Sequence, residues 1–149
     1  MLPIYSGKEI FISESNETKV FPVIDDYISI RKDHSVELKL KILIDAVSSM
    51  QFNGLHIELQ SLDSQGIAHL NMKENYNYSG PTSLPKFQSW FSYFQGSSGG
   101  LNTMITLKES ILQKSYNNDW INGVIFYYQG KEFGEWDHVH LNGLIKRYE

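Results

Sequence analysis

The sequence predicts an α+β domain, in which a predominantly antiparallel sheet built from β-hairpins is joined to two or three short helices in the second half. Alternation of apolar and polar residues with a period of two dominates the first half of the chain. Turn residues at Asp63–Gly66 separate two of the alternating stretches, and an aromatic group at helical spacing follows at Phe87–Phe94. These three observations assign hairpins to the first half and helices to the second.

The longest alternating stretch, Val36–Ile44, predicts a strand, because five apolar residues occupy every second position. A helix through Leu40, Leu43, Ile44 and Val47 is the alternative, since Leu43 breaks the polar face. The uninterrupted alternation favours the strand.

Shorter strands are expected over residues 9–13 and 19–24, around the polar turn 14–18, and over residues 27–31. Pro22 limits its segment to an edge or irregular strand, because proline donates no ladder hydrogen bond.

A further hairpin is expected where Leu55–Gln60 and Ile67–Met72 alternate on either side of Asp63–Gly66. Gly66 is suited to positive φ in its turn.

In the second half, residues 74–85 are rich in Asn, Tyr, Ser, Gly and Pro and indicate a connection. Phe87, Trp90, Phe91 and Phe94 fall at i, i+3, i+4 and i+7 and predict a short aromatic helix, with Ser83 as its cap, Pro85 in its first turn and Gly96 at its end.

Residues 96–100 then predict a flexible loop. Thr106 and Glu109 have the form of a capping box, which predicts a second helix over residues 107–116.

The last third combines aromatic, acidic and histidine residues. Trp120–Tyr128, a turn at Gln129 and Gly130, and Phe133–Trp136 predict a hairpin. Beyond it, a terminal helix with Asp137 as a possible cap is predicted from the spacing of Leu141, Leu144, Ile145 and Tyr148.

Composition bounds the class of protein. The chain has 149 residues, which matches a single globular domain over residues 1–149. A net charge of −4 argues against direct binding of nucleic acid and favours a cationic partner. Without cysteine there are no disulfides or thiolate metal sites, and no apolar stretch is long enough to span a bilayer. A soluble, cytoplasmic protein is expected.

His138 and His140 straddle Val139, so on a strand both imidazoles would point to one face, with Glu135 and Glu149 as possible further ligands. The pattern is similar to the His-x-His of cupin metal sites, but no Glu follows four or five residues after His140. On a helix the two side chains would point about 200° apart. Exposed or partner-facing histidines are therefore favoured, and we expect no metal and no cofactor.

Catalytic patterns are weak in this sequence. Asp25 and Asp26 would point to opposite faces of a strand, whereas Glu135 and Asp137 would share one, and a solvated charged face explains both pairs. No Ser lies in a Gly-x-Ser-x-Gly elbow, and the loop around Ser98 lacks the phosphate-binding signatures. We therefore expect no catalytic residue.

Acidic side chains beside aromatic ones suit the surface of a basic protein, since interfaces use aromatic anchors with complementary charge. The residues that form this pattern are Glu132, Phe133, Glu135, Trp136 and Asp137, and Asp25 with Asp26 forms a second acidic patch. A half-buried hairpin with a charged outer face is the alternative interpretation.

In its size, its Asn/Ile/Lys/Tyr-rich composition and its ending Gly134-Glu135-Trp136-Asp137 before a Leu/Ile/Tyr segment, the chain resembles the immunity proteins of bacterial contact-dependent growth inhibition and related polymorphic toxin systems. The resemblance covers the last third and carries over no single functional residue. It implies a cytoplasmic protein that binds a cognate toxin domain, often a nuclease, and blocks its active site.

Two other functions are open at this point. One is a small metal-assisted enzyme using Glu135, His138 and His140, and the other is an accessory domain that forms oligomers through the aromatic helix at Phe87–Phe94.

Overall fold

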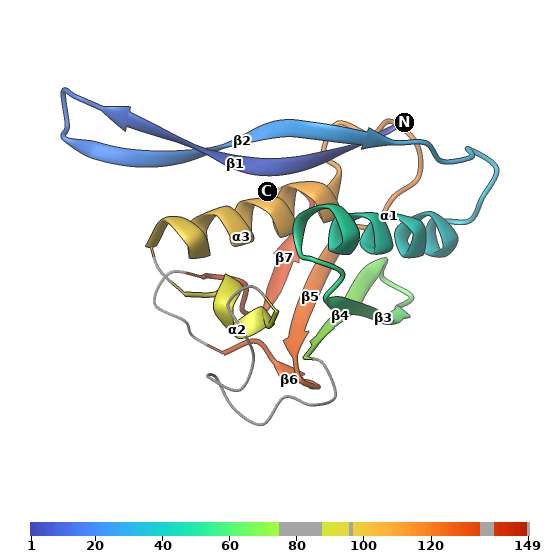
Figure 1. The fold of residues 1–149 in the computed structure, drawn as a ribbon. Helices are drawn as coiled ribbons and strands as arrows, with labels where there is room; N and C mark the ends of the chain where they lie inside the picture. Colours follow the sequence, from blue (N-terminus) through green and yellow to red (C-terminus); the bar gives the residue numbers. More distant parts are fainter. Residues whose placement is uncertain (75–87, 96, 135–138, 149) are drawn as a thin grey trace.

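The structure is a computed structural model that describes residues 1–74, 88–95, 97–134 and 139–148. Its elements stack in three layers: a two-stranded ribbon of β1 and β2, a middle layer with helices α1 and α3, and a second sheet that contains β3, β4 and β5 (Figure 1). Antiparallel pairs predominate, and helices α2 and α3 lie in the second half, so the predicted α+β class is confirmed.

The ribbon consists of β1 (Leu2–Ile12) and β2 (Glu17–Ile28), which pair antiparallel along their whole length. The strands predicted over residues 9–13 and 19–24 are thus confirmed and are longer than expected. Pro22 lies opposite Gly7 in a two-stranded sheet, where every position is an edge position. The separate strand predicted over residues 27–31 is wrong, because β2 itself runs on to Ile28 and ends there.

Helix α1 (Val36–Gln51) replaces the strand predicted over Val36–Ile44. The Ser35 hydroxyl caps it by accepting from the Leu38 N–H at 3.2 Å. Leu40, Leu43, Ile44 and Val47 are buried, whereas Leu38 is 42% exposed. The helical stripe was therefore the correct alternative, and the alternation over nine residues was coincidental.

The hairpin of β3 (His56–Leu62) and β4 (Ile67–Lys73) confirms the prediction around Asp63–Gly66, and Gly66 has a φ of 78°. The Asp63 carboxylate accepts the backbone N–H groups of Gln65 and Ile67 at 2.9 and 3.0 Å. The turn is thus closed by its own side chain.

The predicted aromatic helix is reduced to one turn, α2 (Trp90–Tyr93), which Ser89 caps. Ser83, Pro85 and Phe87 lie outside the described residues, as does the connection over residues 75–85.

Helix α3 (Ser97–Leu112) begins where a flexible loop was predicted, so that prediction is wrong for residues 97–100. The capping-box prediction is also wrong, because Thr106 lies inside the helix and its hydroxyl donates to Asn102 Oδ1 at 3.1 Å. Packing of the ribbon against α3 outweighs the low helix propensity of the glycines. Gln113, with a φ of 45°, ends the helix earlier than predicted.

Strand β5 (Gly123–Tyr128) pairs in parallel with β4, and helices α2 and α3 lie in the crossover between them. The turn at Gln129 and Gly130 leads into β6 (Lys131–Glu132), so the predicted hairpin is present, but its second strand begins two residues earlier than expected. The terminal helix is wrong: β7 (Leu144–Lys146) pairs antiparallel with the first half of β5. Its proposed cap, Asp137, lies outside the described residues.

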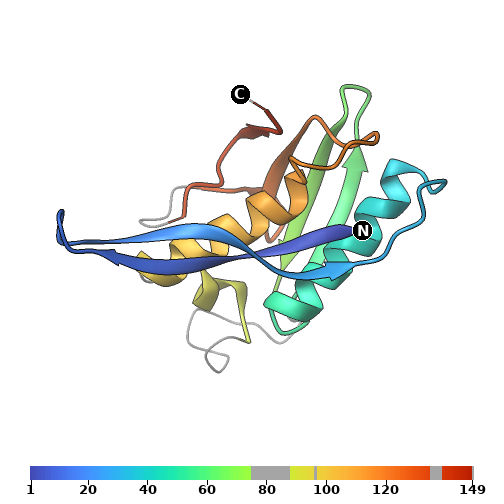
Figure 2. The ribbon, with the colours of Figure 1, turned by 90° about the horizontal axis from the view of Figure 1, so that it is seen from above.

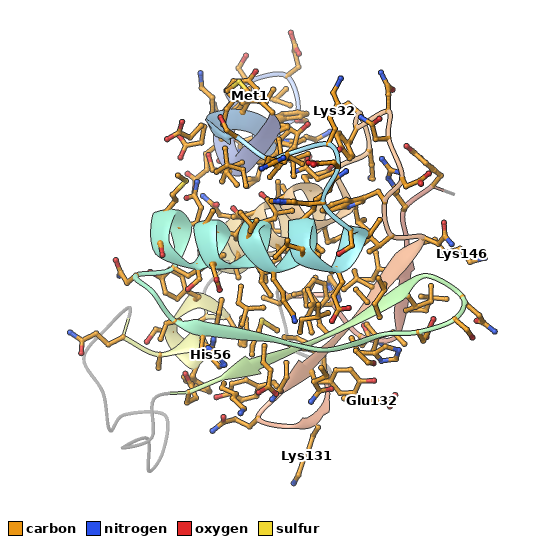
Figure 3. All side chains as sticks on the ribbon, turned by 90° about the vertical axis from the view of Figure 1, so that its right-hand side faces the viewer. Met1, Lys32, His56, Lys131, Glu132 and Lys146 are labelled. Carbon is orange, nitrogen blue, oxygen red and sulfur yellow. The ribbon has the colours of Figure 1, made fainter. Side chains whose placement is uncertain are left out.

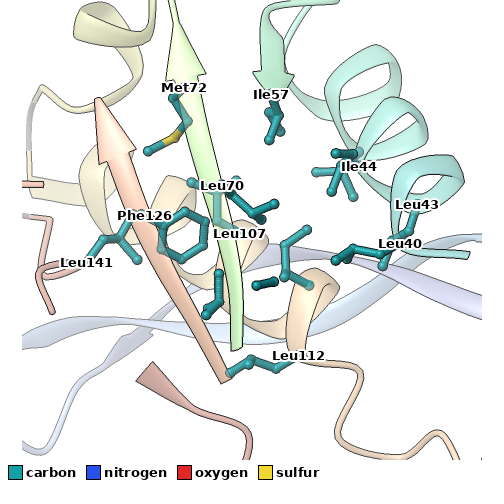
Figure 4. Packing of buried hydrophobic residues seen from close by; sticks show 14 of the residues in the cluster. Leu40, Leu43, Ile44, Ile57, Leu70, Met72, Leu107, Leu112, Phe126 and Leu141 are labelled. Atoms are coloured by element: carbon teal, nitrogen blue, oxygen red, sulfur yellow. The ribbon is translucent and has the colours of Figure 1, made fainter. Parts of the chain in front are cut away.

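One apolar core fills the space between the helices and the sheet (Figure 4). It includes Leu40 and Ile44 of α1, Leu107 of α3, Leu70 of β4 and Phe126 of β5, all 3% exposed or less. None of the helices in the described part of the chain combines the length and the apolar character that a membrane span needs.

Candidate protein-binding surface

The base of the ribbon is fixed to α3 by side chains that bond to the outer edge of β1. Ser110 Oγ accepts the Tyr5 N–H at 3.0 Å, and Asn102 both accepts the Gly7 N–H and donates to the Gly7 carbonyl, each at 3.2 Å. Gln113 Nε2 donates to the Pro3 carbonyl at 2.7 Å. The helix thus takes the place of a third strand along this part of the ribbon.

The hydrogen-bonding pattern of β1 also shows which backbone groups point outward beyond Gly7. In an antiparallel pair, backbone groups of alternate residues point away from the partner strand. Those of Pro3, Tyr5 and Gly7 point toward α3, so those of Glu9 and Phe11 are the next to point outward. No group in the described part of the chain bonds to them, and β1 therefore has an open edge at its distal end.

The distal ribbon also exposes large apolar side chains. Its turn end projects beyond the N-terminal end of α3 (Figures 1 and 2). Exposures of 41% to 61% are found there at Ile10, Phe11 and Phe21. Ile24 and Tyr27 are exposed too, but they lie opposite Tyr5 and Pro3, at the base of the ribbon. Exposed apolar residues that gather on one element indicate an interaction site more than scattered ones do.

Exposed apolar side chains lie on both faces of the ribbon. Lys8 pairs with Phe21 and Ile10 pairs with Lys19, so Ile10 and Phe21 are diagonal neighbours on one face. Phe11 pairs with Thr18 and belongs to the opposite face. A partner that covers either face, or wraps around the ribbon, would bury apolar area.

A cavity of about 330 Å³ lies where the ribbon meets the helices. Asp25 lines it and accepts a hydrogen bond from Gln51 Nε2 at 2.8 Å. Tyr93 lines it too, and burial raises the pKa of its phenol. The cavity adds a polar recess to the base of the exposed surface.

The acidic residues that were predicted to bind a partner lie on different parts of the molecule. Asp25 and Asp26 are exposed on β2, and Asp26 accepts the neighbouring Tyr27 N–H at 2.7 Å. Glu132 is exposed on β6, at the opposite end of the layers from Met1 (Figure 3). Glu135, Trp136 and Asp137 lie outside the described residues. The structure therefore does not bring Glu132 together with the Asp25 and Asp26 patch.

Most of the residues considered as metal ligands lie outside the described part of the chain. His140 is exposed, while Glu135, His138 and Glu149 lie outside the described residues. Within the described ranges, no three His, Asp or Glu side chains are grouped closely enough to hold a metal ion.

The aromatic helix cannot present an oligomer surface through its largest side chains. Trp90 is completely buried and Phe94 is 2% exposed. Trp90 donates from Nε1 to the His56 carbonyl at 3.1 Å. These rings belong to the core.

A hydrogen-bonded chain of three side chains crosses the second sheet and was not predicted from the sequence. His69 Nε2 lies 3.0 Å from Asp63 Oδ2, and His69 Nδ1 lies 2.8 Å from the Tyr127 hydroxyl. Because a carboxylate only accepts, Nε2 carries the proton and a neutral His69 accepts from Tyr127 at Nδ1. The hydrogen bond from His69 is the main cause that lowers the pKa of the Asp63 carboxyl. Only the turn chemistry of Asp63 was visible in the sequence, since His69 and Tyr127 are 58 residues apart.

No known family model matches the chain, and comparisons with curated proteins and with solved structures found no match either.

Proposed function

We propose that the protein is an immunity-type inhibitor, which binds a cognate toxin domain through the β1–β2 ribbon and blocks the toxin's active site. The observation that supports this most is the distal ribbon, where an open strand edge coincides with three exposed large apolar side chains, Ile10, Phe11 and Phe21. Strand addition to such an edge, with apolar contacts from alternate side chains, is a common mode of protein recognition.

The charge of the ribbon suits a basic partner. Residues 8–26 contain five acidic residues, Glu9, Glu14, Glu17, Asp25 and Asp26, and only two lysines. An acidic surface speeds encounter with a basic domain, such as a nuclease that binds phosphates, and disfavours acidic competitors. Glu132, Glu135, Trp136 and Asp137 remain a second candidate contact under this proposal.

The shape of the ribbon supports inhibition by occlusion. The part of β1 beyond Gly7, residues 8–12, spans about 17 Å, which is long enough to enter an active-site cleft. The hydrogen bonds that β1 makes with Asn102, Ser110 and Gln113 hold its base, so little freedom is lost on binding there. Acidic side chains then occupy the place of the substrate's phosphates.

The test uses the protein encoded immediately upstream, because a toxin and its immunity protein must be inherited together. Co-expression should restore growth of cells that produce this toxin, and the purified chains should form a stoichiometric complex. We expect Phe11→Ser or Phe21→Ser to weaken binding about tenfold to a hundredfold, as truncation of an aromatic anchor does. Leu144→Ser is the matched control, since Leu144 is 49% exposed on β7, in the second sheet.

Several results would contradict the proposal. The first is the absence of binding and rescue. Another is equal weakening by Leu144→Ser and Phe11→Ser. A homodimer that dissociates on Phe11→Ser, seen by light scattering without any effect of the upstream protein, would support the accessory-domain function instead. Charge reversal at Glu132, compared with reversal at Asp26, tells which acidic patch touches the partner.

A further inference from the structure

The molecule has a second recess, whose charge is opposite to that of the ribbon. A cavity of about 330 Å³ lies between the C-terminal part of α3 and the segment that contains β7. Its charged lining residues are Lys108 and Lys114 on one side and Lys146 and Arg147 on the other. Among the described residues no carboxylate lines it, although the whole chain has a net charge of −4.

Among the residues that the structure describes, few acidic side chains compensate this charge. Lys114 Nζ lies 3.4 Å from Glu109 Oε1, a long contact on the surface. In the described part of the chain, Lys108 and Lys146 take part in no ion pair. Cations that are gathered in a recess without counter-charges repel one another, and an anion bound among them relieves that repulsion.

The partial negative charge at the C-terminus of α3 does not explain why all four cationic side chains gather there. Buried Arg147 already donates to the carbonyls of Leu112, Gln113 and Tyr116 at 2.9, 2.6 and 2.8 Å. The Tyr148 hydroxyl donates to the Lys114 carbonyl at 2.7 Å. The carbonyl groups that follow the helix are thus satisfied, and the three lysines are surplus to this role.

Arg147 is also held ready to bind a ligand. Its Nε and Nη2 atoms make the three carbonyl contacts, and the guanidinium lies 4.9 Å from the centre of the Tyr148 ring. Nη1 has no acceptor among the described residues. A donor whose side chain is already ordered loses little freedom when it binds an oxyanion.

From this arrangement we infer that the recess binds a small organic phosphate of about nucleotide size. Lysine and arginine are the usual ligands of phosphate groups, and the volume is at the lower end of small-molecule sites. Partly buried Ile145 and the exposed Tyr148 ring supply apolar surface for the organic part. This site is independent of the ribbon and of the proposed toxin binding.

Titration calorimetry on the full chain at low ionic strength tests the inference, with ADP and inorganic pyrophosphate as probes and citrate as the carboxylate comparison. We expect both phosphates to bind, and the double variant Lys108→Gln/Lys146→Gln to weaken binding by at least about tenfold. Lys41→Gln is the control, because it removes a charge from the outer face of α1. Amide NMR shifts on adding ADP should concentrate at residues 108–114 and 145–148.

Each alternative outcome overturns the inference. Absence of binding does so, and so does binding that the double variant leaves unchanged. Citrate binding as tightly as pyrophosphate would show a site for any anion. An oligonucleotide that binds through the same lysines while ADP does not would show a nucleic-acid surface. Because both lysines lie off the ribbon, the double variant should still bind the upstream toxin, so the two proposals fail separately.

Discussion

Replacing the buried Glu74 with alanine should destabilise the fold strongly, and more than the removal of an exposed acidic side chain. Glu74 is 8% exposed, and its Oε1 accepts the Trp90 N–H at 2.6 Å. Its Oε2 accepts the Phe91 N–H at 3.2 Å and the Tyr128 hydroxyl at 2.8 Å. The carboxylate therefore joins the end of β4 to the start of α2 and to β5.

The magnitude follows from these three donors. A buried donor left without an acceptor costs about 1–3 kcal/mol, and the long bond to Phe91 counts for least, so Glu74→Ala should lower the free energy of unfolding by about 3–5 kcal/mol. Glu74→Gln keeps one carbonyl oxygen, and we expect a loss of about 1–2 kcal/mol. Urea denaturation at neutral pH, followed by tryptophan fluorescence, measures both.

Glu58→Ala is the control for this prediction. Glu58 pairs with Lys73 at 3.0 Å, but both side chains are more than a third exposed, so its removal should cost less than about 1 kcal/mol. A Glu74→Ala protein as stable as Glu58→Ala would refute the reasoning, as would a glutamine variant no more stable than the alanine variant.

Two further predictions concern the ribbon and pH. Gly7→Ala should loosen the ribbon by about 1–3 kcal/mol, because the added Cβ would lie 2.6 Å from Val20 Cγ1 and 3.2 Å from Asn102 Cα. Hydrogen exchange should speed up in β1 but not in β4, whereas Gly99→Ala, which meets no atom within 4 Å, should leave the ribbon intact and stabilise α3. For pH, the folded-state pKa of Asp63 is lowered, chiefly by His69, so its contribution to stability is present above the unfolded pKa and disappears as pH falls through the folded value. The stability difference between wild type and Asp63→Asn should therefore be constant near neutral pH and shrink below about pH 4, and a difference that grows on acidification would contradict this.

Local signals in the sequence predicted the hairpins well. The turn at Asp63–Gly66 carries its own hydrogen bonds and positive φ, and the ribbon strands alternate in register around a polar turn. Such elements are determined by residues close together in the chain.

The predictions of secondary structure were wrong where contacts between residues far apart in the sequence determine the element. Val36–Ile44 alternates like a strand, but Ser35 caps a helix, and the stripe from Leu40 to Val47 is buried in the core. Residues 97–100 are helical because β1 lies against α3, and Leu144–Lys146 is a strand because β5 offers it a free edge. The exposed distal ribbon was missed, because no sequence pattern tells which face of Ile10 or Phe21 will be covered.

The bonds between the ribbon and α3 also set an order of events during synthesis. They join residues 95 to 110 positions apart, whereas the hairpin itself closes around a four-residue turn. At about 5–20 residues per second, the ribbon leaves the ribosome roughly 4–16 s before Asn102 and Ser110 do. During that interval the nascent chain carries its apolar strands without a supporting layer, so early capture by a chaperone competes with docking onto α3.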